Sequence, residues 1–157
     1  MDAPKYDWSE WRSITLPTEH WEPGIYQVRL ARDGTAIPIN RLRGTDSMGL
    51  LTIGQTQSVE GRRKQFLKAA TQGGGHSAGN LLNLILNYCQ PDSCLSLDLV
   101  EYRFASVETK ERAEREQALI VRSYILAHCE PPPLNSAIPD RYGEKHGAWE
   151  VPAPEST

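Results

Sequence analysis

The sequence predicts a single α+β domain in which a small three-stranded sheet is flanked by helices. Short stretches with an apolar-polar period of two are separated by longer stretches with the helical period. The length of 157 residues fits one domain. A composition with 39% hydrophobic and 24% charged residues is typical of a globular chain and excludes collagen-like, disordered and coiled-coil classes.

Three segments carry strand patterns. After the turn signal Pro23-Gly24, residues 25–30 alternate, which places Tyr26, Val28 and Leu30 on one face. Residues 31–49 hold four glycines or prolines and no helical period, so they predict a long loop or an irregular hairpin. The second and third expected strands are residues 50–54 and 95–104.

Helices are predicted where an N-cap residue precedes a helical apolar pattern. The middle helix is rich in leucine and is expected to be almost wholly buried. Three glycines separate the first helix from the second, and three prolines from Pro131 prevent the last helix from continuing. The expected helices are residues 59–71 after the cap Ser58, residues 78–88 after Ser77, and a long helix from the cap Ser106 to about Cys129.

The domain is expected to span residues 23–139, between an N-terminal extension (1–22) and a loose C-terminal tail (140–157). The extension carries Trp8, Trp11 and Trp21, which are expected to pack on the main body. No window approaches the ~18 apolar residues of a membrane span, and no signal region follows the first residues. Three cysteines, an odd number, indicate reduced thiols, so a soluble cytoplasmic protein without membrane contact is expected.

The charge is unevenly distributed. The net charge is −3, but residues 27–76 carry eight cations against three acids. A basic zone in an acidic protein favours an anionic ligand approached from one side, although scattered surface arginines would give the same count. The cations expected to contact nucleic acid are Arg41, Arg43, Arg63, Lys64 and Lys68.

Several different short motifs follow one another along this domain. Gly24-Ile25-Tyr26 is followed by Thr52-Ile53-Gly54, and Arg62 lies eight residues after Gly54, with the apolar Val59 three positions before it. Glu116 is followed by Leu119-Ile120, and Leu134-Asn135 closes the series. Over residues 23–139 the chain resembles the GIY-YIG nuclease superfamily, with threonine at Thr52 where the second motif of that family has tyrosine.

The resemblance implies a mainly antiparallel sheet and a metal-dependent DNA endonuclease, a hydrolase of phosphodiester bonds, with one divalent ion, Mg²⁺ or Mn²⁺. DNA is the implied partner, duplex or single-stranded. In this interpretation Tyr26 accepts or relays a proton, Arg62 stabilises charge on the phosphoryl oxygens, and Glu116 holds the metal. His76 would serve in the active site, although it lies further from Arg62 than in the family. The supporting residues would be Thr52, Gly54 and Asn135.

The residues themselves point the same way. Glu116 interrupts a buried helical stripe, so its carboxylate must be paired or bind a metal. Arg62 lies at the margin of its helix's core-facing side, and a guanidinium suits a phosphoryl group. His76 lies beside a glycine run and a helix N-terminus, a place that attracts phosphate. Each residue also has a structural alternative. Glu116 could be a salt-bridged glutamate and Arg62 a solvated charge on a helix face. His76 could be a loop histidine and Tyr26 a core tyrosine.

A rival interpretation is a degenerate member that binds nucleic acid or a protein without cutting. Thr52 favours it, because a threonine hydroxyl cannot replace a phenol as an acid or base. The acidic overall charge favours it too.

Since no separate DNA-binding domain is recognisable, targeting of the nuclease would come from the loop 31–49, from the tryptophan-bearing extension, from a protein partner or from homo-oligomers.

Overall fold

A computed structural model describes residues 5–89 and 95–136. It is a mixed α+β fold, as the sequence predicts. In chain order the elements are β1 (Arg12–Ser13), β2 (Gly24–Arg32), β3 (Thr35–Ala36), β4 (Ile39–Asn40), β5 (Thr45–Asp46), β6 (Leu50–Thr56), α1 (Val59–Gln72), α2 (Ser77–Tyr88), a 3₁₀ turn (Leu97–Leu99), β7 (Val100–Ser106) and α3 (Lys110–His128).

The long strand β2 is the centre of the main sheet. It pairs antiparallel with β6 on one side and with β7 on the other, while the short strands β1 and β3 extend the sheet to five strands. The register places Tyr26 opposite both Gly54 and Phe104. The expected antiparallel pairing is confirmed. The three expected strands correspond to β2, β6 and β7, the long strands of this five-stranded sheet.

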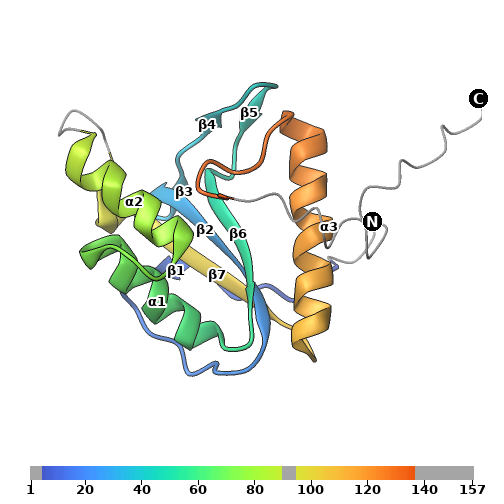
Figure 1. The fold of residues 1–157 in the computed structure, drawn as a ribbon. Coiled ribbons are helices and arrows are strands. Elements are labelled where there is room, and N and C mark those ends of the chain that lie inside the picture. Colours follow the sequence, from blue (N-terminus) through green and yellow to red (C-terminus); the bar gives the residue numbers. More distant parts are fainter. Residues whose placement is uncertain (1–4, 90–94, 137–157) are drawn as a thin grey trace, which may run out of the picture.

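Helices cover both faces of this sheet, with α1 and α2 on one side and α3 on the other (Figure 1). Tyr26, Val28 and Leu30 share one core with Phe66 of α1 and Leu82 of α2, so the predicted face of β2 is confirmed. On the other side, β6 packs on α3 through Ile53 and Val121. Because β2 is covered on both sides, its residues are buried from Gly24 to Ala31.

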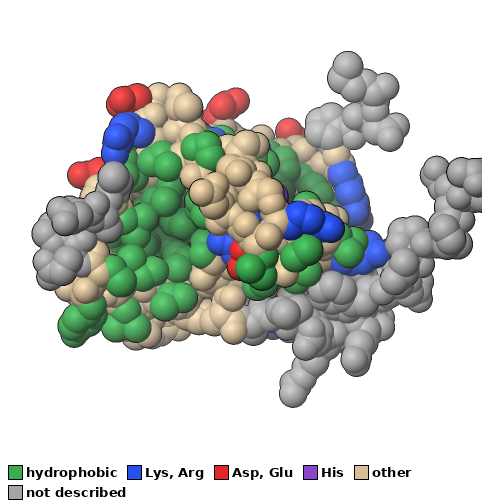
Figure 2. All heavy atoms as spheres, turned by 90° about the horizontal axis from the view of Figure 1, so that it is seen from above, with side chains coloured by type: hydrophobic (Ala, Val, Ile, Leu, Met, Phe, Trp, Pro, Cys, Tyr) green, Lys and Arg blue, Asp and Glu red, His purple; other side chains and the backbone are tan. Residues whose placement is uncertain are grey.

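The expectation that α2 is almost wholly buried is wrong. Only Ala78, Gly79 and Leu82 are buried in this helix, while Leu84 is 45% and Tyr88 76% exposed. Figure 2 shows hydrophobic side chains gathered at the left, on the side where α2 lies. Periodicity alone could not separate a buried helix from one covered on a single face.

Two of the three predicted helix caps are displaced. Ser58 caps α1 as expected, its Oγ accepting from the Gly61 N–H at 3.2 Å. The cap of α2 is His76 rather than Ser77, and that of α3 is Thr109 rather than Ser106. The third strand begins at Val100, because the 3₁₀ turn takes the residues before it.

Residues before the expected domain boundary belong to the sheet. Arg12 and Ser13 form β1 against β7. Trp8 and Trp11 sandwich the Arg103 guanidinium at 4.5 and 4.6 Å and pack on the core, whereas Trp21 is 53% exposed. The N-terminal segment is therefore part of the fold.

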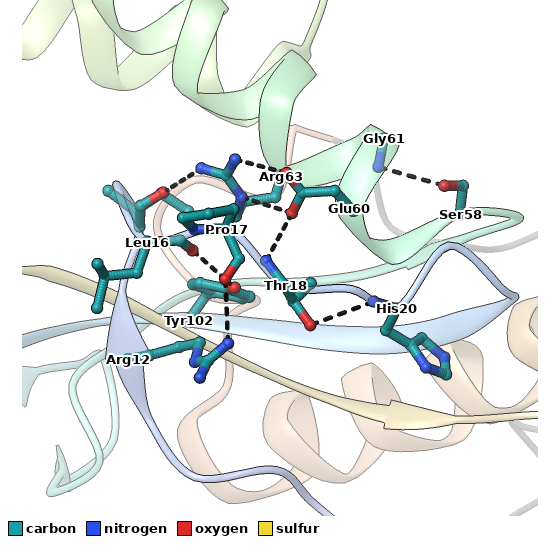
Figure 3. Close-up of polar contacts among 11 residues, drawn as sticks. Arg12, Leu16, Pro17, Thr18, His20, Ser58, Glu60, Gly61, Arg63 and Tyr102 are labelled. Atoms are coloured by element: carbon teal, nitrogen blue, oxygen red, sulfur yellow. Dashed lines mark hydrogen bonds and ion pairs between the residues drawn. The ribbon is translucent and has the colours of Figure 1, made fainter.

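A charged cluster ties this segment to α1. The Arg63 guanidinium donates to both carboxylate oxygens of Glu60, at 2.8 and 2.7 Å, and to the Ile14 carbonyl at 2.8 Å. Glu60 also accepts from the Thr18 N–H (Figure 3). Hydrogen bonding from Arg63 lowers the pKa of Glu60, and Glu60 raises that of Arg63. We call this network, Arg63 with Glu60, Ile14 and Thr18, the Arg63 cluster.

No helix in the described part of the chain is long and apolar enough to cross a membrane. The expected C-terminal tail, residues 140–157, lies outside the described residues.

Candidate functional site

A cavity of about 350 Å³ opens beside β6, where α1, α2 and α3 approach this strand. It gathers residues from both motif strands, from the glycine run and from the segment after α3. We call it the Arg62 cavity. Its lining is Tyr26, Thr52, Ile53, Gly54, Gln55, Arg62, Gly75, His76, Ser77, Ala78, Gln117, Leu134, Asn135 and Ser136.

Gly54 allows the Tyr26 phenol to lie across β6. The two residues are paired between β2 and β6. A Cβ at position 54 would overlap the Tyr26 ring and hydroxyl. The glycine of the second motif therefore has a packing reason that is independent of any resemblance, and its role as a supporting residue is steric.

The hydrogen bonds of His76 fix the role of Tyr26. His76 Nδ1 accepts from the Gly79 N–H at 3.3 Å, as the cap of α2. A neutral ring whose Nδ1 accepts must carry its proton on Nε2. Nε2 lies 3.1 Å from the Tyr26 hydroxyl oxygen, so it donates to that oxygen. The phenolic proton of Tyr26 then remains free for an acceptor in the cavity.

Both members of this pair are uncharged near neutral pH. Burial, together with the nearby Arg62 charge, lowers the pKa of His76 to about 4. Burial raises the pKa of Tyr26 to about 12, against the opposing effect of Arg62. Tyr26 is therefore a neutral phenol at pH 7 that can donate a hydrogen bond, which favours neither accepting nor relaying a proton as the resemblance implies.

The Arg62 guanidinium has no hydrogen-bond or ion-pair partner among the described residues, and its Nε is buried without one. Burying the nitrogen of a cation without a partner costs free energy. The guanidinium groups of Arg29, Arg41 and Arg63 each pair with a glutamate, although the Arg41 Nε is also buried without a partner of its own among the described residues. The unpaired guanidinium makes the cavity attractive to an anion.

Other donors meet at the same place. Ser77 and Ala78 begin α2 and line the cavity, and the first N–H groups of a helix have no partner within it. A helix N-terminus favours negative charge. With Arg62 and the Tyr26 hydroxyl, these groups form a donor set that suits a phosphate.

Amide side chains hold the floor of the cavity. Asn135 spans both polar groups of Ile53: its Oδ1 accepts from the Ile53 N–H at 3.0 Å and its Nδ2 donates to the carbonyl at 3.1 Å. Gln117 Nε2 donates to the same carbonyl at 3.1 Å. Asn135 therefore braces the edge of β6. Thr52 lines the cavity and is buried.

The structure does not bring Glu116 to Tyr26, Arg62 and His76. The Glu116 carboxylate accepts from the Tyr6 hydroxyl at 2.5 Å, and it lies 3.1 Å from Lys5 Nζ and 3.9 Å from Arg112 Nε. Burial opposes ionisation, but hydrogen bonds from Tyr6 and Lys5 lower the pKa of Glu116. The alternative of a salt-bridged glutamate describes its contacts.

The lining residues do not fit a divalent ion. Glu116, the expected ligand, is turned toward cations, and among the described residues no aspartate or glutamate lines the Arg62 cavity. The described residues also contain no group of three His, Cys, Asp or Glu that could hold a metal ion. Hard divalent ions are usually held by carboxylate oxygens, so the described lining residues do not supply the expected ligands for Mg²⁺ or Mn²⁺.

The cations expected to contact nucleic acid mostly have structural partners. Arg41 donates to the Pro131 carbonyl at 2.8 Å and pairs with Glu130 at 3.0 Å. Arg43 donates to the carbonyls of Leu126 and Ala127, at the end of α3. These contacts fasten the β4–β5 hairpin to α3. Arg63 is buried in its cluster, while Lys64, 4.8 Å from the Trp21 ring, and Lys68 are exposed.

Gln117 and Gln55 are among the cavity residues that sequence reasoning missed. The sequence predicts that Glu116 points into the site from α3. In the structure the residue of α3 that lines the cavity is the next one, Gln117. Gln117 lies seven residues after Lys110 and three after Glu114, and all three line hollows beside β6. That helical spacing was a signal in the sequence.

Comparison with known protein families, with curated proteins and with solved structures finds no match for this chain.

Proposed function

We propose that this protein binds the phosphate backbone of nucleic acid in the Arg62 cavity without hydrolysing it. The observation that carries the proposal is the Arg62 guanidinium, which has no partner among the described residues although its Nε is buried. The Tyr26 hydroxyl and the N-terminus of α2 add neutral donors. The resemblance to GIY-YIG nucleases favours nucleic acid over other phosphate-bearing ligands.

Binding without hydrolysis follows from the same residues. Cleavage of the kind expected needs a metal to stabilise the phosphoryl charge, and the carboxylate assigned to hold it pairs with Lys5 and Tyr6. The Tyr26 oxygen accepts from His76 Nε2, so the neutral phenol keeps its own proton and can donate it to a ligand rather than accept a proton from water. These donors serve one phosphate as a fixed set of contacts.

A labelled single-stranded oligonucleotide, followed by fluorescence anisotropy at several salt concentrations, tests this proposal. Arg62→Ala should weaken binding about tenfold and reduce the salt slope by about 0.7, the value for one phosphate contact on a single strand. Arg32→Ala, an exposed arginine at the end of β2, is the matched control and should behave like the wild type. Equal affinity in the Arg62 variant would overturn the proposal.

A second candidate is cleavage of the same backbone. It is favoured by the meeting of Tyr26, Arg62 and His76 around one cavity. A plasmid-nicking assay with Mg²⁺ or Mn²⁺ separates the two functions. We expect no nicking; metal-dependent nicking that disappears in Arg62→Ala would replace binding by hydrolysis as the function.

A further inference from the structure

A second hollow adjoins the Arg62 cavity and shares part of its wall. It has a volume of about 330 Å³ and, like the cavity, includes Gln55 and Arg62 in its lining. We call it the glutamine hollow. Its lining is Gln55, Thr56, Gln57, Ser58, Gly61, Arg62, Gln65, Lys110 and Glu114.

Apart from Arg62, which the two hollows share, the charges in the glutamine hollow are paired with one another. Lys110 Nζ lies 3.7 Å from the Glu114 carboxylate, so the ammonium has a partner of its own. Among the described residues no apolar side chain lines the hollow. A second phosphate is not favoured beside Glu114, whereas an uncharged group rich in hydrogen-bonding atoms is.

The environment of Gln55 indicates which hydrogen-bonding group the ligand must carry. Its Oε1 is buried and has no hydrogen-bond partner within the described part of the chain. An amide oxygen only accepts, and an ionised phosphate has no donor to offer it. A ligand that reaches from Arg62 to Gln55 must therefore carry an N–H or O–H group next to its phosphate. The base amino groups and sugar hydroxyls of nucleotides are such donors.

We infer that the glutamine hollow holds the nucleoside part of a single nucleic-acid strand whose phosphate lies in the Arg62 cavity. This inference rests on the proposed function and names its substrate class. The amides of Gln55 and Gln65 offer both donors and acceptors, which match the edges of a base. A base can enter a hollow only when it is unstacked, so a single strand is preferred to a duplex.

The test compares three probes: inorganic phosphate, a labelled single-stranded oligonucleotide, and the same sequence as a duplex. Gln55→Leu removes the acceptor with little change of size. It should lower affinity for the single strand about five- to tenfold. Gln72→Leu, at the exposed end of α1, is the control and should have no effect.

Gln65→Ala provides a second variant, because Gln65 is exposed on α1 and its removal should not disturb folding. It should also lower affinity for the single strand, and it should leave affinity for inorganic phosphate unchanged, because Gln65 lines the glutamine hollow and not the Arg62 cavity. If both variants bind the single strand like the wild type, or if the duplex binds as tightly as the single strand, the inference is overturned while the phosphate site stands. If the wild type binds phosphate but no oligonucleotide, both this inference and the proposed function fail.

Discussion

Arg62 and Arg63 are neighbours on α1 but belong to two regions that use their charge in opposite ways. In the Arg63 cluster every strong charge is matched: the guanidinium donates to Glu60 and to the Ile14 carbonyl (Figure 3). In the Arg62 cavity the guanidinium meets neutral groups, Tyr26, His76 and amides. The paired arginine stabilises the fold, and the unpaired one is available to a ligand.

Breaking the paired region should have the largest effect. Arg63→Ala leaves the Glu60 carboxylate, which is 1% exposed, without its partner. Removing one member of a buried pair costs about 3–5 kcal/mol. Urea unfolding should show this loss, whereas Arg62→Ala should leave the free energy of unfolding within about 0.5 kcal/mol of the wild type. Similar losses in both variants would erase the contrast.

The pH dependence of stability should report the buried His76. Its pKa is about 4 in the folded protein and 6.5 unperturbed. Between these values the unfolded chain binds a proton that the folded chain does not, so stability falls as pH falls from 6.5 to 4. The difference amounts to about 3 kcal/mol at most.

The control for this measurement is His76→Asn, which retains a capping side chain but cannot titrate. Unfolding curves at pH 7.5 and pH 4.5 should show a smaller loss for the variant than for the wild type. Equal losses would mean that His76 is protonated in the folded protein.

Gly54→Ala should disturb the cavity from its floor. The added methyl group would overlap the Tyr26 ring, so the phenol must move away from His76. Overpacking of this kind costs about 1–3 kcal/mol, and oligonucleotide affinity should fall with it. Gly74→Ala is a control at a glycine with open space around it, although its φ of 78° adds strain. A crystal structure of Gly54→Ala with Tyr26 unmoved would contradict this account.

Glu116→Gln should have the smallest effect. It weakens contacts with Lys5, which is 60% exposed, and with Tyr6, and it should cost about 1 kcal/mol of stability. Oligonucleotide affinity should not change, because Glu116 lies outside the Arg62 cavity. A loss of binding in this variant, measured by anisotropy beside Arg62→Ala, would return Glu116 to the site.

The sequence predicted the long helices and strands and some of the residues that line the Arg62 cavity. Tyr26, Gly54 and Arg62 could be found because strand alternation and motif spacing are local properties of the chain. The spacing of Lys110, Glu114 and Gln117 was a weak signal for the side of α3 that faces β6. It could not decide between Glu116 and Gln117, because packing of Val121 on β6 sets how α3 is rotated about its axis. Nor could local patterns show that Arg41 is paired, because Glu130 lies far from it along the chain. The pair of Arg63 with Glu60, three residues apart on α1, was a local signal that the sequence analysis did not use.

The most direct test of the account is a titration of the ¹⁵N-labelled protein with a single-stranded oligonucleotide, followed by NMR. We expect the largest shifts at the Arg62 Nε–H and at the backbone N–H groups of Ser77 and Ala78, with the Arg63 Nε–H unchanged as an internal reference. Shifts confined to Lys64 and Lys68, with the Arg62 signal unmoved, would contradict the claim that the unpaired arginine holds a phosphate.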